Sequence, residues 1–213
     1  LARAAHHLPL LTGGSAFAGH LPAAWRAAGL IGPARDRADL PALPPGPAVI
    51  LSGSCSAMTR RQVAAYAAEA PALKLDPLRL DRGDDGGMAE WLSAQLHAGR
   101  VPIIHGTAEP AEVAAAQAAL GAERAGALVE DSLARAATLA RGLGVTRFVV
   151  AGGETSGAIT GALGVTVLRV GAEIAPGVPW CAGEDGAGPL ALALKSGNFG
   201  DERFFERALQ AAG

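Results

Sequence analysis

Short apolar runs recur along the chain, and a cluster rich in Gly, Ser and Thr follows each of them. The clearest runs cover residues 48–51, 101–104, 147–151 and 190–194. Runs of this length bounded by Gly are typical of buried strands. A fifth run, at 8–11, contains Pro9 and is therefore predicted as the start of a strand or as an edge strand.

Helical spacing fills the stretches between these runs. Predicted helices cover residues 59–69, 87–98, 109–141, 158–164 and 201–212, with Gly121 and Gly126 as candidate breaks in the third. Segment 33–47 contains five prolines and is predicted as a loop, and segment 183–188 as a flexible turn. The alternation predicts an α/β fold with a mostly parallel sheet flanked by helices, and we expect a single domain over residues 1–213.

Composition excludes several classes of protein. Half of the 213 residues are apolar, which supports a packed core and excludes wholesale disorder. The formal net charge of −2 gives no reason to expect nucleic acid or a membrane as a partner. Two cysteines, Cys55 and Cys181, without CxxC spacing argue against a zinc site and a disulfide scaffold. They favour a reducing compartment, and we expect the cytoplasm.

Four of the Gly-, Ser- and Thr-rich clusters have the composition of an anion-binding site. They cover residues 12–15, 52–56, 152–157 and 195–200. In parallel α/β sheets, ligands bind at the carboxyl ends of the strands. Gly lets backbone N–H groups approach a ligand, hydroxyls add donors, and a helix that begins there adds the positive end of its dipole. The clusters therefore predict a cradle for an anion, of which phosphate is the commonest.

The cluster at 152–157 follows a strong strand and precedes a helical stretch, as a nucleotide phosphate loop does. Its Glu154 can hold Mg²⁺ directly or through water. The alternative is an ordinary strand–helix turn capped by Thr or Ser.

Lys195 directly follows an apolar strand, where a buried charge needs a partner. The chain has two lysines, Lys74 and Lys195, against 16 arginines, so a Lys here suggests a compact point charge for a phosphate. A solvent-facing lysine at the sheet edge is the alternative. Cluster 52–56 offers hydroxyl and N–H donors, and its Cys55 is expected to be a small buried side chain rather than a nucleophile.

The remaining sequence features give little information about function. The chain lacks the Walker P-loop, GxGxxG and GxSxG motifs. His105 follows a strand and is expected to be structural or solvated. Asp81, Asp84 and Asp85 lie among glycines, but their spacing is not that of a calcium loop, so a solvated turn is expected.

In order, these motifs resemble those of the four-carbon acid sugar kinases, and more narrowly the 3-oxo-tetronate kinases. The matching segments are residues 52–56 with Thr59, 152–157, 171–180 and 192–200. Asn198 favours the 3-oxo-tetronate kinases within this family, and a D-threonate/D-erythronate kinase is the alternative.

The resemblance implies a two-domain kinase whose N-terminal half binds the sugar acid and whose C-terminal half is a nucleotide-binding domain for ATP. This chain is similar to the C-terminal half only, and because it starts at Leu1 rather than Met, we expect a piece of a longer protein. The implied reaction transfers the ATP γ-phosphoryl group to the terminal (4-) hydroxyl of a four-carbon sugar acid such as 3-oxo-tetronate. The piece alone is expected to be inactive, with the catalytic base in the absent domain.

The anion-cradle argument and the resemblance together give one set of candidate nucleotide-binding residues. They are Ser52, Gly53, Ser54, Gly152, Gly153, Glu154, Thr155, Ser156, Lys195, Ser196, Gly197 and Gly200. The implied cofactors are ATP and Mg²⁺, with Glu154 as a metal ligand. The expected partners are ATP and, through the absent domain, the sugar acid, with a homodimer as a further option. A non-catalytic module that binds a small anion, or an assembly module built on the Ala-rich helices, is the alternative from another class.

Overall fold

The computed structural model describes residues 1–34 and 41–212, which fall in two compact units, Leu1–Leu40 and Pro41–Gly213. The first unit contains three short helices, α1 (Ala2–Ala5), α2 (Ser15–Ala18) and α3 (Leu21–Ala27). The strand predicted at 8–11 is wrong, because these residues are not in a strand and Leu8 and Leu10 are exposed. Pro9 has no N–H for a ladder, and residues 1–34 of this unit contain no strand with which it could pair.

The second unit is built on a seven-stranded sheet with the order β2-β3-β1-β4-β7-β6-β5. Its strands are β1 (Ala48–Ser52), β2 (Ala72–Lys74), β3 (Ile103–His105), β4 (Arg147–Ala151), β5 (Arg169–Ala175), β6 (Val178–Asp185) and β7 (Gly188–Lys195). The first five in this order pair in parallel, and β6 and β5 continue the sheet antiparallel. The predicted α/β fold with a mostly parallel sheet is confirmed.

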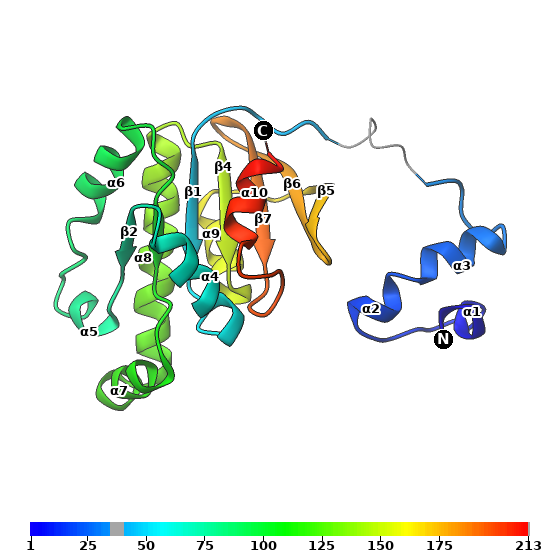
Figure 1. Cartoon of the computed structure of the whole chain (residues 1–213), viewed down its shortest axis with the longest axis horizontal. Helices are drawn as coiled ribbons and strands as arrows, with labels where there is room; N and C mark the ends of the chain where they lie inside the picture. The colour runs from blue at the N-terminus through cyan, green and yellow to red at the C-terminus, as the bar shows by residue number, and fades with distance from the viewer. Residues whose placement is uncertain (35–40, 213) are drawn as a thin grey trace. The chain divides into compact units, whose positions relative to one another are not determined.

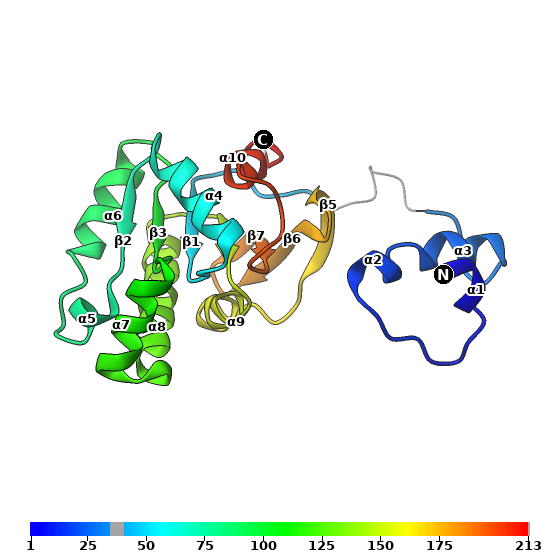
Figure 2. The ribbon, with the colours of Figure 1, turned by 60° about the horizontal axis from the view of Figure 1, so that its bottom comes forward.

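Helices cover both faces of this sheet (Figures 1 and 2). They are α4 (Ala57–Ala67), α5 (Pro77–Leu80), α6 (Met88–His97), α7 (Pro110–Leu120), α8 (Ala122–Gly142), α9 (Gly153–Ala162) and α10 (Phe204–Gln210). Alternate strand residues point to opposite faces. Thus Val49 and Leu51 pack with α6, α8 and α9, whereas Ile50 packs with α4 and α10. The buried apolar runs of the sequence form the middle of this sandwich.

Several element boundaries differ from the prediction. The long helix at 109–141 breaks at Gly121, which has φ +83°, and continues through Gly126. The turn predicted at 183–188 is wrong over its first part, because β6 runs to Asp185 and pairs with β7 as a hairpin. In the predicted loop 33–47, residues 33–34 and 41–47 contain no helix or strand, and residues 35–40 lie outside the described part.

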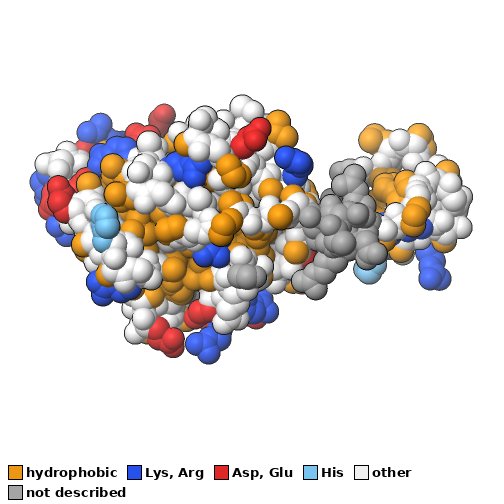
Figure 3. Space-filling model, turned by 90° about the horizontal axis from the view of Figure 1, so that it is seen from above, with side chains coloured by type: hydrophobic (Ala, Val, Ile, Leu, Met, Phe, Trp, Pro, Cys, Tyr) orange, Lys and Arg blue, Asp and Glu red, His pale blue; other side chains and the backbone are white. Residues whose placement is uncertain are grey.

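Charged side chains of both signs lie on the face of the molecule shown in Figure 3. On the face shown in Figure 3, acidic and basic side chains of the second unit are interspersed among apolar ones. No helix among residues 1–34 and 41–212 has the length and apolar character needed to cross a membrane.

Candidate functional site

The parallel strands β3, β1, β4 and β7 bring their following loops to one edge of the sheet. Ser52, the last residue of β1, pairs with His105 of β3 and with Ala151 of β4, and Ala151 pairs with Lys195 of β7. The loops after these residues therefore begin side by side. Three of the four predicted glycine-rich clusters meet here, and the fourth, 12–15, lies in the first unit at the start of α2.

The β1 and β4 loops pack so closely that glycine is required. The N–H groups of Gly53 and Ser54 both donate to the carbonyl oxygen of Ala151, at 3.0 and 3.2 Å. A Cβ atom on Gly53 would collide with the hydroxyl of Thr155, and one on Gly152, which has φ +131°, would lie 2.7 Å from the same hydroxyl. Thr155 is thus buried between the two loops.

The β7 loop is held against the start of α4. Lys195 is fully buried, and its ammonium group donates to the Thr59 hydroxyl at 3.0 Å, to the Gly197 carbonyl at 2.6 Å and to the Ser196 carbonyl at 3.3 Å. The Thr59 hydroxyl in turn donates to the Gly197 carbonyl at 2.7 Å. Burial lowers the pKa of Lys195 to about 8. This lysine therefore supports the loop from inside instead of projecting into solvent.

A second contact clamps the same loop. Gln62, also on α4, donates through Nε2 to the carbonyl oxygens of Phe199 and Asp201, at 3.0 and 2.7 Å. On the side of β1, a Cβ atom on Gly197 would lie 2.9 Å from the Ser54 hydroxyl. The β7 loop is consequently fixed against both α4 and the β1 loop.

The hydroxyl groups of the β1 loop have protein partners. Ser52 is buried, and its Oγ lies 2.9 Å from Oγ1 of Thr107, which donates to the Ser54 carbonyl at 2.9 Å. Ser56 caps α4 by accepting from the Thr59 N–H at 3.3 Å. These contacts tie the β3 loop to the β1 loop and orient the backbone of residues 53–55.

A pocket of about 530 Å³ adjoins these loops. At the sheet edge it is lined by Gly53, Cys55, Gly106 and Glu154. From there it extends between the β2–α5 connection and the helices α7 and α8, where the walls are mostly apolar. The apolar wall residues are Leu75, Pro77, Leu78, Val113, Ala116, Ala125 and Val129.

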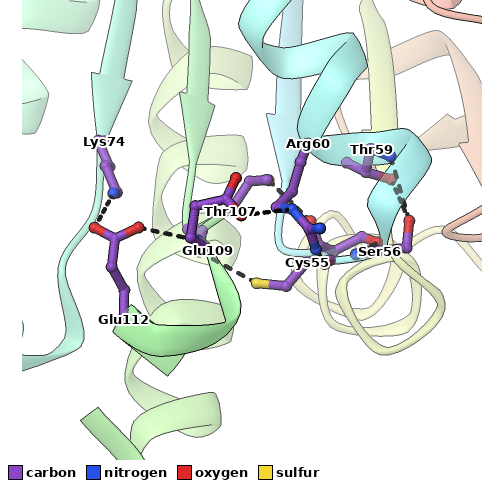
Figure 4. Close-up of polar contacts among 10 residues, drawn as sticks. Cys55, Ser56, Thr59, Arg60, Lys74, Thr107, Glu109 and Glu112 are labelled. Carbon is purple, nitrogen blue, oxygen red and sulfur yellow. Dashed lines mark hydrogen bonds and ion pairs between the residues drawn. The ribbon is translucent and has the colours of Figure 1, made fainter. Parts of the chain in front are cut away.

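Charged groups lie at both ends of the pocket. Glu130 of α8 and Glu154 of α9 line it near the sheet edge, and burial, followed by the charge of Glu154, raises the pKa of Glu130. At the β2 side, Lys74 contacts Glu112 at 2.6 Å (Figure 4). The hydrogen bond from Lys74 lowers the pKa of Glu112. Among the described residues, no group of three or more His, Cys, Asp and Glu forms a ready metal cage.

His105 belongs to the support of this site. It is buried, its Nδ1 donates to the Thr107 carbonyl at 3.3 Å, and burial lowers its pKa. The imidazole is therefore neutral at pH 7 and acts as a structural group.

The predicted site residues occupy several kinds of position. Gly53 and Glu154 line the pocket. Ser54, Gly152, Thr155 and Gly197 form the junction of the loops, and Ser156 donates to the Gly152 carbonyl at 2.6 Å. Ser52 and Lys195 are buried beneath the loops, and Gly200, at φ +76°, turns the chain toward α10. Gly153 is exposed at the first position of α9, and Ser196 lies in the β7 loop.

Sequence reasoning missed Glu130 and the pocket walls from α7 and α8. Glu130 lies 24 positions before Glu154, and the two meet because α8 and α9 pack beside each other on one face of the sheet. Lys74 stands out in the sequence as one of two lysines, but β2 has no clear apolar pattern, so its place at this edge could not be inferred.

Glycine-rich loops at the carboxyl edge of a parallel sheet, next to a pocket of this size, are the arrangement in which α/β domains commonly bind small molecules. The chain belongs to the family of nucleotide-binding C-terminal domains, whose family model matches residues 49–205. This stretch lies within the second unit of the structure.

Curated relatives and a solved structure match the whole chain. The 3-oxo-tetronate kinase of Cupriavidus necator is 51% identical over 214 residues, covering 100% of this chain and 49% of the relative. That of Pseudomonas fluorescens is 50% identical over 215 residues, covering 100% and 49%. A crystal structure of a Haemophilus influenzae protein is 36% identical with a TM-score of 0.80, covering 100% of this chain and 50% of that one. The chain thus spans about half the length of the relatives it matches.

Proposed function

We propose that this chain is the ATP-binding half of a kinase that transfers the γ-phosphoryl group of ATP to the terminal hydroxyl of a four-carbon sugar acid such as 3-oxo-tetronate. The family, and the similarity to 3-oxo-tetronate kinases over the full chain, support this proposal. The observation that carries it is the meeting of the β1, β4 and β7 loops beside the pocket.

The start of α9 is the proposed phosphate site. This helix begins at Gly153, directly after β4, and the first N–H groups of a helix have no partner within it. These N–H groups can donate to an anion at the N-terminal end of the helix, where the helix dipole also favours negative charge. The close packing of Gly53 and Gly152 against Thr155 fixes this helix start relative to β1.

The buried ammonium group of Lys195 lies under the β7 loop and contributes positive charge to this site. Its ammonium group is fully buried, without a direct path to solvent. By holding the Gly197 carbonyl, it fixes the β7 loop next to Ser54. Its positive charge beneath the loop also favours a phosphate above it. We therefore expect Lys195 to act on nucleotide binding mainly by positioning the loop.

The carboxylates of Glu130 and Glu154 fit a Mg²⁺ ion. Mg²⁺ uses oxygen ligands and is commonly bound by one or two protein carboxylates together with substrate phosphates. Burial raises the pKa of Glu130, and repulsion by the negative charge of Glu154 raises it further. A cation between the two carboxylates and the phosphates would relieve that repulsion. When bound, the ion would neutralise charge on the transferring phosphoryl group.

Phosphoryl transfer needs positioning and charge neutralisation more than covalent chemistry from the protein. The residues of this chain supply both for the nucleotide. The sugar acid and the base that accepts its hydroxyl proton are assigned to the other half of the full-length protein. The free thiols Cys55 and Cys181 suit a reducing compartment such as the cytoplasm.

Titration calorimetry of the whole chain with ATP and Mg²⁺ tests the proposal. We expect binding of Mg-ATP and no phosphoryl transfer to 3-oxo-tetronate by this chain alone. A folded chain that binds no ATP at millimolar concentration would contradict the proposal. If sulfate or a sugar phosphate then raised the melting temperature, a module that binds a small anion would be favoured instead.

A further inference from the structure

Helix α7 forms one wall of the pocket but has little contact with the core. Val113, Ala116 and Gln117 of this helix line the pocket. Ala116 is the one buried residue of α7, which the structure describes in full, and no residue of this helix belongs to the hydrophobic core of the described part. Figure 1 shows α7 beyond the end of the sheet, against α8. A helix with so few buried apolar contacts opens locally at a lower cost in free energy than the core elements do.

Gly121 is placed as a hinge at the C-terminal end of α7. It separates α7 from α8, and its backbone, with φ +83° and ψ 151°, is outside the helical region. It is exposed, and a Cβ atom built on it would meet no atom within 4 Å. Side-chain packing at this position therefore does not fix the angle between the two helices, and glycine tolerates the backbone rotation that a change of angle requires.

Two ion pairs hold the other end of α7 in place (Figure 4). Glu112, in the first turn of the helix, contacts Lys74 of β2 at 2.6 Å. Glu109, the residue before the helix, contacts Arg60 of α4 at 3.2 Å, and Arg60 also donates to the Cys55 carbonyl of the β1 loop at 2.8 Å. The start of α7 is thus connected to β2 on one side and to the β1 loop on the other.

These ion pairs are exposed and therefore weak. The side chains of Lys74 and Glu112 are 45% and 53% exposed, and that of Glu109 is 67% exposed. Exposed ion pairs contribute little to stability, because water and salt screen them. They can break and re-form at small cost, which suits a contact that opens and closes.

We propose that α7 is a lid over the pocket, which turns about Gly121 and is held closed by the two ion pairs at its start. The inference rests on the proposed function, because the pocket that α7 closes is lined by Glu154 of α9, next to the proposed phosphate site. Opening of α7 removes one wall of the pocket and gives a nucleotide a path into and out of the site. Closing then keeps water away from the bound phosphates.

Two substitutions that each break one ion pair test the lid. Glu109→Gln keeps a side-chain oxygen at the start of α7 and lies outside the pocket lining, and Lys74→Met removes the partner of Glu112. The two substitutions change the net charge in opposite directions, so an altered attraction of ATP cannot make both variants behave alike. Thermal unfolding confirms that each variant is folded.

Stopped-flow fluorescence of the whole chain with Mg²⁺ and a fluorescent ATP derivative, mant-ATP, gives the association and dissociation rates. The lid is closed in the free chain as in the complex, so weaker ion pairs make it open more often without favouring either closed state. We expect both variants to raise both rates about two- to fivefold, while Kd changes less than about twofold.

Two control variants separate the lid from a general loss of charge. Arg61→Met removes an ion pair with Glu202 at 3.1 Å that is equally exposed, but neither residue lines the pocket, so both rates should stay unchanged. Lys74→Arg keeps the positive charge beside Glu112 and should behave like the parent chain.

Hydrogen exchange followed by mass spectrometry locates the motion. In the free chain, the amides of residues 110–120 should exchange faster than those of residues 129–140, the buried part of α8. Glu109→Gln and Lys74→Met should speed exchange at 110–120 about two- to fivefold and leave β4 unchanged. Saturating Mg-ATP should slow exchange at 110–120 in every variant.

The possible failures point to different conclusions. A rise of the dissociation rate alone, with Kd weakened in proportion, would overturn the inference, because the ion pairs would then only stabilise the bound state. Amides of residues 110–120 that exchange no faster than those of 129–140 would also overturn it. In both cases the parent chain still binds nucleotide and the proposed function stands. If the parent chain binds no nucleotide, the proposed function fails and the lid fails with it.

Discussion

The ammonium nitrogen of Lys195 lies 3.0 Å from the hydroxyl oxygen of Thr59, a residue 136 positions earlier in the sequence. Both side chains are fully buried. None of the ion pairs found among residues 1–34 and 41–212 involves Lys195. Its ammonium group contacts one hydroxyl and two carbonyls and lies 5.9 Å from the centroid of the Phe204 ring. A buried cation without a carboxylate partner costs free energy, which these contacts partly offset.

The pH dependence of stability should reveal this buried charge. The pKa of Lys195 is about 8 in the folded chain and 10.5 ordinarily, so the folded state loses its proton first as the pH rises. Below pH 8 the folded chain carries the buried charge, and the free energy of unfolding is lowered by its full cost. Above pH 8 the ammonium group loses its proton in the folded state, and the free energy of unfolding rises. We expect the parent chain to gain about 2 kcal/mol relative to Lys195→Met between pH 7 and 9.5.

Urea unfolding of both chains at several pH values measures this difference. Comparing the two chains cancels the titration of other groups, such as Cys181, whose pKa is raised by burial. Lys74→Arg leaves Lys195 as the single lysine, so that its Cε signal can be titrated directly by NMR. A difference that stays constant over this pH range, with a lysine titrating near 10.5, would refute the buried-charge account.

Removal of the Thr59 hydroxyl should loosen the β7 loop. Thr59→Val keeps the shape of the side chain but takes an acceptor from Lys195 and a donor from the Gly197 carbonyl. We expect a loss of about 1–3 kcal/mol in the free energy of unfolding and weaker ATP binding. Thr59→Ser, which keeps the hydroxyl, is the control and should retain most of both. Equal behaviour of the two variants would show that the hydroxyl is not the stabilising group.

Features that depend on neighbouring residues could be predicted from the sequence, whereas features that depend on residues far apart in the sequence could not. Local patterns were sufficient to predict strands β1, β3, β4 and β7 and the glycine clusters after β1, β4 and β7, because each depends on neighbouring residues. Lysine was rare enough to single out Lys195, but the direction of its side chain depends on Thr59, far away in sequence.

Elements whose stability comes from tertiary packing were harder to predict. Strand β2 has three residues with only Leu73 partly buried, so it offers little apolar pattern. Gly126 was a candidate helix break, yet α8 continues through it because Ala125, Val129 and Leu133 pack against the core. The pocket walls follow from this packing and could not be derived from the local sequence.

The Glu154 carboxylate should make ATP binding depend on Mg²⁺. Without the metal, a carboxylate near the phosphates is repulsive, so Glu154→Gln should bind ATP in EDTA at least as tightly as the parent chain. With Mg²⁺ present, the same variant should bind about tenfold more weakly, because a metal ligand is lost. Calorimetry under the two conditions measures both effects.

Glu123→Gln is the control for charge removal. Glu123 lies in the first turn of α8, as Glu154 does in the first turn of α9, and it is exposed but does not line the pocket. It should change neither measurement. If Glu154→Gln weakened ATP binding to the same extent with Mg²⁺ and with EDTA, Glu154 would contribute to the shape of the site and not to metal binding.

The rates at which the two cysteines are chemically labelled should report whether the pocket is occupied. Cys55 is half-buried and lines the pocket, with its thiol 3.7 Å from the Gly106 carbonyl. Cys181 is buried in β6, and burial raises the pKa of its thiol, so it should react more slowly with iodoacetamide. Saturating Mg-ATP should slow the labelling of Cys55 about tenfold by covering it, while the rate at Cys181 stays within about twofold. Mass spectrometry of the labelled peptides gives both rates in one sample. Equal slowing at both sites would mean that ATP only stabilises the fold, and an unchanged rate at Cys55 would place the nucleotide outside this pocket.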